Sequence, residues 1–255
     1  MTEPVPAMRG VDRALRLITV LGGRGSGYTL DELSRVLDLP KSSLHRILAV
    51  FRANGYATQP EPGGRYFLGP AALEAAFRFH ESMDLRMLVH QLILQIRDRF
   101  DETAHMAVMD GSDVVYLDKV EASHSVRLTS VIGGRNPAHA TGVGKAMLAF
   151  TLADEAQVRS WIALHGPLVA RTENTVVTVD AFAARLDTVR RRGFSLDDEE
   201  SELGVRCVAV PVFFGSKVPV AAVSVTAPKD RLRIGDAETL GRSLRDLVAV
   251  YEKNG

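Results

Sequence analysis

Residues 41–53 have the spacing of a helix that could present one polar face to nucleic acid. At 100° per residue, Ser42 and Arg46 project to the same side, and Ser43 and His45 flank them. Arg46 could hold guanine O6 and N7 in a bidentate contact. The hydroxyls lie at the helix N-terminus, where free backbone N–H groups favour phosphate. The alternative is an ordinary solvated helix face.

The stretch TGVGK at residues 141–145 precedes a predicted helix and could hold an anion. Its glycines let a ligand approach the backbone, whose exposed N–H groups are donors. It is not a nucleotide-binding P-loop, because that motif needs a glycine five positions before Gly144 and a hydroxyl residue after Lys145. This chain has His139 and Ala146 at those two positions. Nucleotide hydrolysis is therefore not indicated.

Two strand-like runs late in the chain, residues 205–212 and 220–226, alternate a bulky apolar face with a face of small or weakly polar groups. Small side chains leave room for a ligand, and Cys207, Ser224 and Thr226 offer polar atoms there. A mostly apolar pocket with a few aimed polar groups suits a small molecule. Ordinary packing against a helix explains the same pattern equally well.

The residue pattern gives little support to an enzyme. Cys207, the only cysteine, could be a nucleophile, but its strand surrounds it with valines, where a thiol normally stays protonated. The seven histidines show no H-x-x-x-H or H-E-x-x-H pairing, so no metal and no cofactor are expected. A structural protein that bridges DNA is the other alternative, although it would not need the glycine stretch.

The polar-faced helix needs neighbours that position it. A helix is predicted at residues 11–21, whose apolar residues at helical spacing are Val11, Leu15, Ile18 and Leu21. Thr29 and Glu32 then match the capping box that begins a second helix. A short turn at residues 38–40 joins this helix to the polar-faced one, whose core residues are Leu44, Ile47, Leu48 and Phe51. Two helices joined in this way predict a helix-turn-helix unit.

A hairpin is predicted directly after the polar-faced helix. Residues 56–59 and 65–68 are short strand-like runs around a Pro/Gly-rich turn. At this place in the chain the hairpin would be the wing of a winged helix-turn-helix, and Arg65 could contact phosphate from it. The predicted DNA contacts are Lys41, Ser42, Ser43, His45, Arg46 and Arg65.

The remainder of the chain mixes helices and strands. Helices are predicted at 71–100, with an interruption near 82–84, and at 142–152, 180–192 and 235–251. Strands are predicted at 104–110, 113–121, 125–132, 205–214 and 218–226. These elements interleave without a regular βαβ rhythm, which favours an α+β fold.

The composition is typical of a globular protein of one or two domains. Of 255 residues, 46% are hydrophobic, with 31 basic and 31 acidic side chains. Residues 1–68 carry nine basic and six acidic groups, a weak excess of positive charge. No apolar run approaches the roughly 20 residues of a membrane-spanning helix, and the N-terminus lacks a signal-peptide pattern. A cytoplasmic protein without membrane contact is expected.

The segment TLDELSRVLDLPKSSLHRILAVFRANGY and the following RYFLG resemble the winged DNA-binding domain of the IclR family of bacterial transcription regulators. The resemblance continues, in the family's order and spacing, through VVYLDKVEAS, GRNPAHATGVGKAMLAF, RRRGFSLDDEESELGVRCVAVPV and VAAVSVTAP. It implies a winged helix-turn-helix domain at residues 1–69, a linker helix at 70–84 and a GAF-like α+β effector-binding domain at 85–255. It also implies a homodimer or homotetramer.

The resemblance further implies that the effector is a small organic acid or aromatic compound. Its implied contacts are Gly142 and Val143, as backbone donors, and the side chains of Asp197, Cys207, Ser224 and Thr226. Asp197 has an alternative place, because the acidic run 197–200 is more often solvated surface than pocket. Ionised Asp197 would repel a second carboxylate at close range, which favours a ligand hydroxyl beside it.

Together these observations predict a ligand-responsive transcription regulator, repressor or activator. It would bind double-stranded operator DNA, and a small hydroxy-, keto- or aromatic acid would control it. Tight binding to a pseudo-palindromic operator needs at least a dimer. Candidates for the dimer contact on the linker helix are Leu73, Ala76 and Phe77, which could instead pack within one chain.

Overall fold

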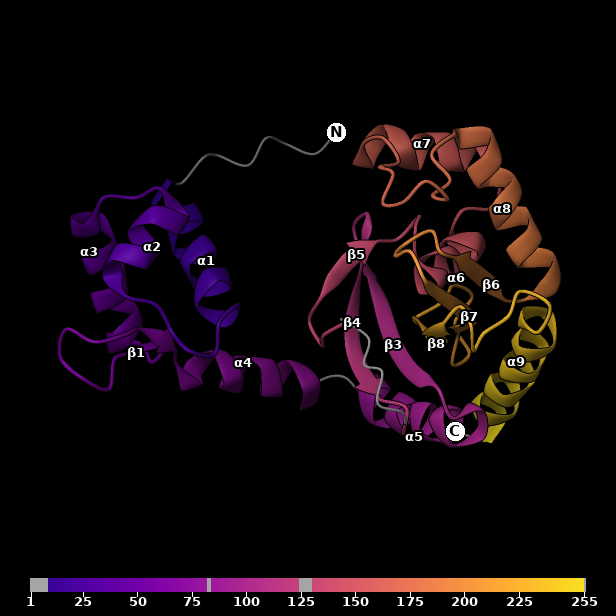
Figure 1. The fold of residues 1–255 in the computed structure, drawn as a ribbon, viewed down its shortest axis with the longest axis horizontal. Helices are drawn as coiled ribbons and strands as arrows, with labels where there is room; N and C mark the ends of the chain where they lie inside the picture. Colours follow the sequence, from indigo (N-terminus) through magenta and orange to yellow (C-terminus); the bar gives the residue numbers. More distant parts are fainter. Residues whose placement is uncertain (1–8, 82–83, 124–129, 255) are drawn as a thin grey trace. The chain divides into compact units, whose positions relative to one another are not determined.

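The computed structural model describes residues 9–81, 84–123 and 130–254 of the chain (Figure 1). The chain divides into two compact units, residues 1–84 and 85–255. Each unit has a hydrophobic core of its own. Within the described ranges, no helix is both long and apolar enough to cross a membrane.

The first unit is helical and includes a short two-stranded hairpin. Its elements are α1 (Arg9–Gly22), α2 (Leu30–Leu37), α3 (Lys41–Ala53), β1 (Ala57–Thr58), β2 (Phe67–Leu68) and α4 (Pro70–Glu81). Thr29 caps α2, and the Glu32 side chain accepts a hydrogen bond from the Thr29 N–H, so the predicted capping box is present. β1 and β2 pair antiparallel. The predicted winged helix-turn-helix is confirmed.

The core of this unit differs from the prediction in the first helix. On α3, Leu44 and Leu48 are buried as predicted. On α1, however, Val11 and Leu15 are 49% and 60% exposed. The buried α1 residues include Leu17, which the pattern at 11–21 did not single out. The buried stripe of α1 therefore runs along Leu17 and Leu21, and it leaves an apolar stripe of the same helix uncovered.

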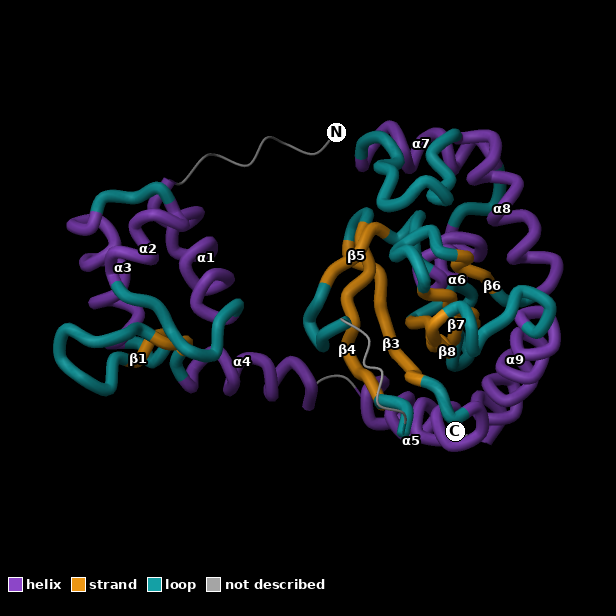
Figure 2. Tube along the Cα trace, in the orientation of Figure 1, coloured by secondary structure: helices purple, strands orange, loops and turns teal. Residues whose placement is uncertain are grey.

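The second unit is a six-stranded sheet with helices around it (Figure 2). The strand order is β5-β4-β3-β8-β7-β6, and all neighbours pair antiparallel. Its strands are β3 (Thr103–Asp110), β4 (Asp113–Val120), β5 (Arg135–Pro137), β6 (Ser195–Asp198), β7 (Val205–Val212) and β8 (Ala221–Pro228). Its helices are α5 (Asp84–Phe100), α6 (Gly142–Thr151), α7 (Glu155–His165), α8 (Val179–Arg192) and α9 (Ala237–Asn254). The α+β class is confirmed.

The two faces of this sheet carry different side chains. The β7–β8 register pairs Cys207 with Thr226 and Ala209 with Ser224, so small and polar groups share one face. α6 packs on that face, where its residues join Cys207 and Ala209 in one core cluster. Val208 and Val210 of β7 alternate to the other face with Val223 and Val225 of β8, and α9 packs against β7. The alternation predicted from the sequence is therefore confirmed.

Some elements of the second unit differ from the prediction. Residues 130–132 are not a strand, while residues 124–129 lie outside the described residues. The strand next to β4 is instead β5, a three-residue edge strand whose Pro137 could not serve in a central strand. α7 and β6 were not predicted at all. β6 is short and charged, and its pairing with β7 makes it a strand.

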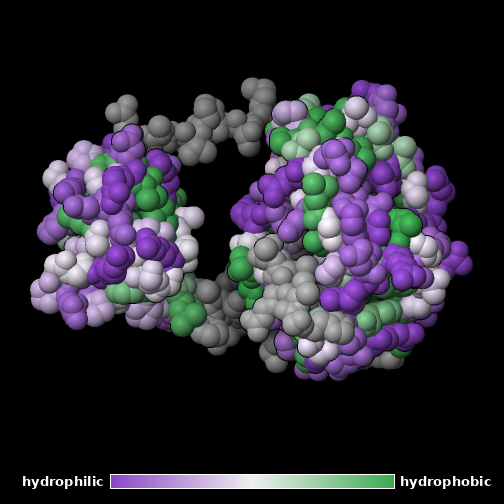
Figure 3. All heavy atoms as spheres, viewed as in Figure 1, coloured by the Kyte–Doolittle hydropathy of each residue, from purple (hydrophilic) through white to green (hydrophobic). Residues whose placement is uncertain are grey.

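Hydrophobic side chains also reach the surface of the second unit. Figure 3 shows them gathered at the end of the unit where α7 lies, on a surface that is otherwise mainly hydrophilic. Leu164 of α7 is 69% exposed, and Val169 in the following loop is 59% exposed.

Candidate functional site

The predicted DNA contacts on α3 lie on its exposed side. Ser42, His45 and Arg46 are exposed, and Ser43 is half-buried. Lys41 pairs with Asp31 of α2, with 2.6 Å between Nζ and Oδ1 and both side chains in solvent. This side of α3 therefore offers hydroxyl, imidazole and guanidinium groups on a helix whose opposite side is fixed in the core.

A shallow groove runs beside this face, between α1 and α3. Ser43 and Arg46 line it from α3, and Arg13 lines it from α1. Arg13 is not among the predicted DNA contacts, because the helix at residues 11–21 was predicted only to support the polar-faced helix. A second helix thus adds positive charge next to the candidate contacts.

Arg65 is held against the start of α2. Its Nη1 donates to Glu32 Oε2 at 2.9 Å and to the Gly27 carbonyl at 2.9 Å. The hydrogen bond from the Thr29 N–H, and then the nearby Arg65, lower the pKa of Glu32. The arginine is therefore fixed by its own domain, with 40% of its side chain still exposed.

The second unit contains a cavity of about 410 Å³ between the start of α6 and the polar face of the sheet. Its lining includes Gly142, Val143, Asp197, Cys207 and Thr226, which are five of the six predicted effector contacts. Ser224 is not among the lining residues; it is 1% exposed and lies 3.4 Å from the Thr226 hydroxyl. The lining residues that the sequence did not point to include His105, Ser130, Tyr116, Arg135, Asn136, Arg171 and Glu202.

The N-terminus of α6 forms one wall of the cavity. Thr141 caps this helix, and its hydroxyl accepts from the Gly144 N–H at 3.1 Å. Gly142 must be a glycine, because a Cβ there would lie 2.8 Å from Cys207 Sγ. The first N–H groups of a helix have no partner inside it, and they carry partial positive charge. This wall can therefore receive a carboxylate.

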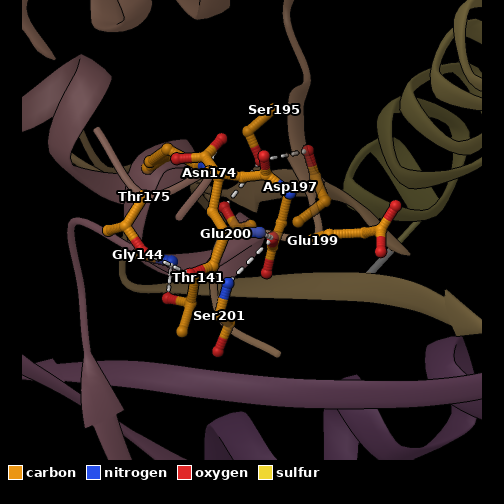
Figure 4. A network of polar contacts seen from close by, with 12 residues as sticks. Thr141, Gly144, Asn174, Thr175, Ser195, Asp197, Glu199, Glu200 and Ser201 are labelled. Atoms are coloured by element: carbon orange, nitrogen blue, oxygen red, sulfur yellow. Dashed lines mark hydrogen bonds and ion pairs between the residues drawn. The ribbon is translucent and has the colours of Figure 1, made fainter. Parts of the chain in front are cut away.

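Asp197 lies at the centre of a buried polar network (Figure 4). Its Oδ1 accepts from the Glu200 N–H at 2.8 Å and from the Ser201 N–H at 3.2 Å. Burial raises the pKa of Asp197 to about 6, against the lowering effect of Lys145. The solvated alternative for the run 197–200 is wrong, because Asp197 and Glu200 are both buried.

A buried ion pair fixes the loop that follows Asp197. Lys145 of α6 and Glu200 lie 2.5 Å apart, Nζ to Oε1, with 0% and 2% of their side chains exposed. The Glu200 carbonyl accepts from the Thr175 hydroxyl at 2.7 Å. The lysine of the TGVGK stretch thus anchors the wall of the cavity from behind and does not line it.

The sheet wall of the cavity is polar and uncharged at its centre. His105 Nε2 lies 2.7 Å from Ser130 Oγ, and His105 Nδ1 lies 3.3 Å from Thr226 Oγ1. Burial lowers the pKa of His105 to about 3, so its ring is neutral at physiological pH. Burial also raises the pKa of Tyr116 to about 12 and that of Cys207 to about 11. The Cys207 thiol is therefore protonated and a poor nucleophile.

This architecture matches known proteins along its length. Residues 10–61 match the IclR helix-turn-helix domain, and residues 77–250 match the bacterial transcriptional regulator IclR C-terminal domain. The transcriptional repressor IclR of Escherichia coli strain K12 is 33% identical over 250 residues, covering 91% of this chain and 90% of the relative.

Two solved structures show the same fold. The IclR protein of Thermotoga maritima has a TM-score of 0.78 at 24% identity, over 97% of this chain and 98% of that one. An IclR homologue of Microbacterium hydrocarbonoxydans, complexed with 4-hydroxybenzoate, has a TM-score of 0.77 at 20% identity, over 96% and 100% of the two chains.

The chain therefore belongs to the IclR family of bacterial transcriptional regulators. It is a DNA-binding regulator of transcription, and the predicted family is confirmed.

Proposed function

We propose that a small organic acid, bound in the cavity of the second unit, sets the affinity of this regulator for its operator. The observation that carries the proposal is the α6 N-terminus, whose Gly142 and Val143 line the cavity beside the hydroxyl of Thr226. The carboxylate lies on the helix N–H groups. A hydroxyl or keto oxygen of the acid lies against Thr226 and neutral His105. The 4-hydroxybenzoate bound by a structural neighbour is an acid of this class.

The proposed readout is a change in the placement of paired DNA-binding units. Ser42, His45 and Arg46 of α3 enter the major groove, and the acid favours one spacing of the two half-sites. A spacing that matches the operator gives binding, and one that misses it gives release. Such a regulator works in the cytoplasm, where the bacterial chromosome lies.

Exposed apolar side chains of the first unit support the proposal that two copies of the chain form a dimer. Val11 and Leu15 project from α1, and Leu73 of α4 is 59% exposed. The side chains of Ala76 and Phe77 lie outside the described residues. A dimer contact on α1 and α4 would remove these apolar groups from water. Light scattering at micromolar concentration is expected to give at least a dimer, and a monomer with full operator affinity would contradict the pairing.

The absence of enzymatic activity is part of the proposal. Cys207, the nucleophile considered from the sequence, lines the cavity, and burial keeps its thiol protonated. Among the described residues, no group of three or more histidines, cysteines or carboxylates could hold a metal ion.

The experiment begins with selection of a tight-binding duplex from a random DNA library by the full-length protein. Fluorescence anisotropy then measures affinity for that duplex with and without 4-hydroxybenzoate, benzoate and short 2-oxo acids. At least one acid is expected to change the affinity about 5-fold or more, the usual lower range of allosteric coupling. If every acid leaves the affinity unchanged, the acid-controlled function is wrong.

Two matched variants locate the bound acid. Thr226→Val removes a hydroxyl that lines the cavity, and we expect about 5-fold weaker acid binding, the effect of one lost hydrogen bond. Ser224→Ala removes a hydroxyl that does not line it and should change acid binding less. Calorimetry gives both values. If Ser224→Ala has the larger effect, the ligand lies elsewhere than in the cavity described.

A further inference from the structure

The cavity has two arginines, and their electrostatic surroundings differ. Arg135 lies beside two carboxylates, 2.6 Å from Asp110 Oδ2 and 3.5 Å from Asp113 Oδ2. These hydrogen bonds, first that of Asp110, raise the pKa of Arg135, and the carboxylates compensate its charge. Arg171 also lines the cavity and is exposed, and no described carboxylate pairs with its guanidinium.

The backbone of Arg171 is held in place although its side chain is exposed. The N–H groups of Arg171 and Thr172 both donate to the Thr175 hydroxyl at 2.9 Å. That hydroxyl in turn donates to the Glu200 carbonyl, and the Thr172 hydroxyl donates to the Glu199 carbonyl at 2.6 Å. The short segment 171–175 is therefore bound to the loop that follows Asp197. The backbone that carries this guanidinium therefore does not have to become ordered when an anion binds.

The size of the cavity leaves room for more than a simple monoacid. A cavity of about 150 Å³ is enough for benzene, whereas this one has about 410 Å³. A monoacid with a single ring or short chain, bound with its carboxylate at the α6 N-terminus, would leave part of the cavity unfilled. Arg171 lines the cavity and is exposed, whereas Asp197 is only 5% exposed. A second anionic group on the exposed guanidinium of Arg171 would not have to enter the buried surroundings of Asp197.

From these observations we propose that the effector is a dicarboxylate, with one carboxylate at the α6 N-terminus and the other on the guanidinium of Arg171. This inference rests on the proposed acid-controlled function and specifies its ligand class. Arg171 is then the specificity-determining residue, because a planar guanidinium holds a carboxylate through two parallel hydrogen bonds. His105 and Tyr116, which are both neutral, also line the cavity.

The test compares acids that differ only in the second carboxylate. The pairs are hexanoate with adipate, 2-oxopentanoate with 2-oxoglutarate, and benzoate with terephthalate. Calorimetry on the full-length protein is expected to give at least 10-fold tighter binding of the diacid in one or more pairs. In Arg171→Gln, the diacid should bind only as tightly as its monoacid partner does.

Arg135→Gln is the matched control. It removes a second cavity arginine whose charge is already compensated, so the diacid preference should survive. The melting temperature of each variant without ligand checks that it is folded.

Three results would overturn the proposal. If monoacids and diacids bind equally well, the acid-controlled function stands, but the effector is not specifically a dicarboxylate. A diacid preference that persists in Arg171→Gln would remove Arg171 as its cause. If none of the six acids binds, the acid-controlled function fails together with this inference.

Discussion

The two units of the molecule place their candidate contacts in opposite settings. In the first unit, His45 and Arg46 lie on the solvent side of a single helix, with the apolar core behind it. In the second, the cavity takes residues from several strands, loops and a helix start, and Asp197 and Cys207 are 5% and 8% exposed. The candidate DNA-contact face can therefore change without touching the core. The proposed effector cavity is built from groups that also hold its unit together.

This difference predicts how substitutions in each unit behave. In the first unit, binding and folding should separate, because the exposed side of α3 is not packed. In the second, they should be coupled, because the cavity wall depends on the buried pair of Lys145 and Glu200.

Lys145→Met should destabilise the second unit by about 3–5 kcal/mol, because it leaves the Glu200 carboxylate buried without its partner. Urea unfolding can be followed specifically, since the only tryptophan is Trp161 in α7. The first unit has no tryptophan and should not contribute to this signal.

The double variant Lys145→Met/Glu200→Leu is the control for that experiment. It removes both charges, so much of the lost stability should return. If the single substitution costs under about 1 kcal/mol, the pair does not hold the cavity wall.

Asp197→Asn should change how stability depends on pH. The pKa of Asp197 rises from its ordinary 3.8 to about 6 on folding, so the folded protein keeps a proton that the unfolded chain releases. That stabilisation is complete below pH 3.8 and is lost as pH rises through 6. The asparagine of the variant does not titrate, so the variant does not lose stability in this way. Its free energy of unfolding relative to that of the parent should therefore increase by about 2–3 kcal/mol between pH 4 and 7.

Urea unfolding at several pH values, again with Trp161 fluorescence, measures the difference. Other titrating groups, including His105, are common to both proteins and cancel in it. A stability difference that is constant from pH 4 to 7 would mean that Asp197 is not protonated in this range.

The same contrast explains what the sequence could predict. In the first unit, the capping box and the α3 face depend on residues three or four positions apart, and spacing alone located them. In the second, alternation assigned Cys207 and Thr226 to one face of the sheet. Alternation does not tell which residues of that face reach the cavity, and so Ser224 was predicted as a contact although it does not line the cavity.

Residues brought to the cavity from distant segments were missed. His105 lies 121 positions from its partner Thr226, and only the β3–β8 register brings the two together. Arg171 lies in a loop, where no periodicity marks a side chain as functional. Long-range pairing and loop placement are set by the whole fold and leave no local pattern.

Arg46→Ala should cost about 1–3 kcal/mol of affinity for a selected duplex if Arg46 contacts a base edge. The melting temperature should not change, since this side chain is exposed and lies on the opposite side of α3 from the buried Leu44 and Leu48. Arg52→Ala is the control on the same helix: Arg52 is exposed and bonded to Gln59 at 3.2 Å. Equal losses of affinity in the two variants would indicate a general charge effect instead of a base contact.

Arg65→Ala is expected to have the smallest effect, and it tests whether a residue anchored within its own domain still contacts DNA. One nitrogen of Arg65 bonds to Glu32 and Gly27, and the rest of the guanidinium keeps its donors for a phosphate. Losing one phosphate contact should lower the slope of log affinity against log salt by about 0.9, without changing sequence preference. Fluorescence anisotropy between 50 and 200 mM salt measures the slope.

Glu32→Gln is the companion variant, since it weakens the hydrogen bonding that anchors Arg65 and keeps the arginine itself. If the slope falls only in Glu32→Gln and not in Arg65→Ala, Arg65 serves the fold of the wing and makes no contact with DNA.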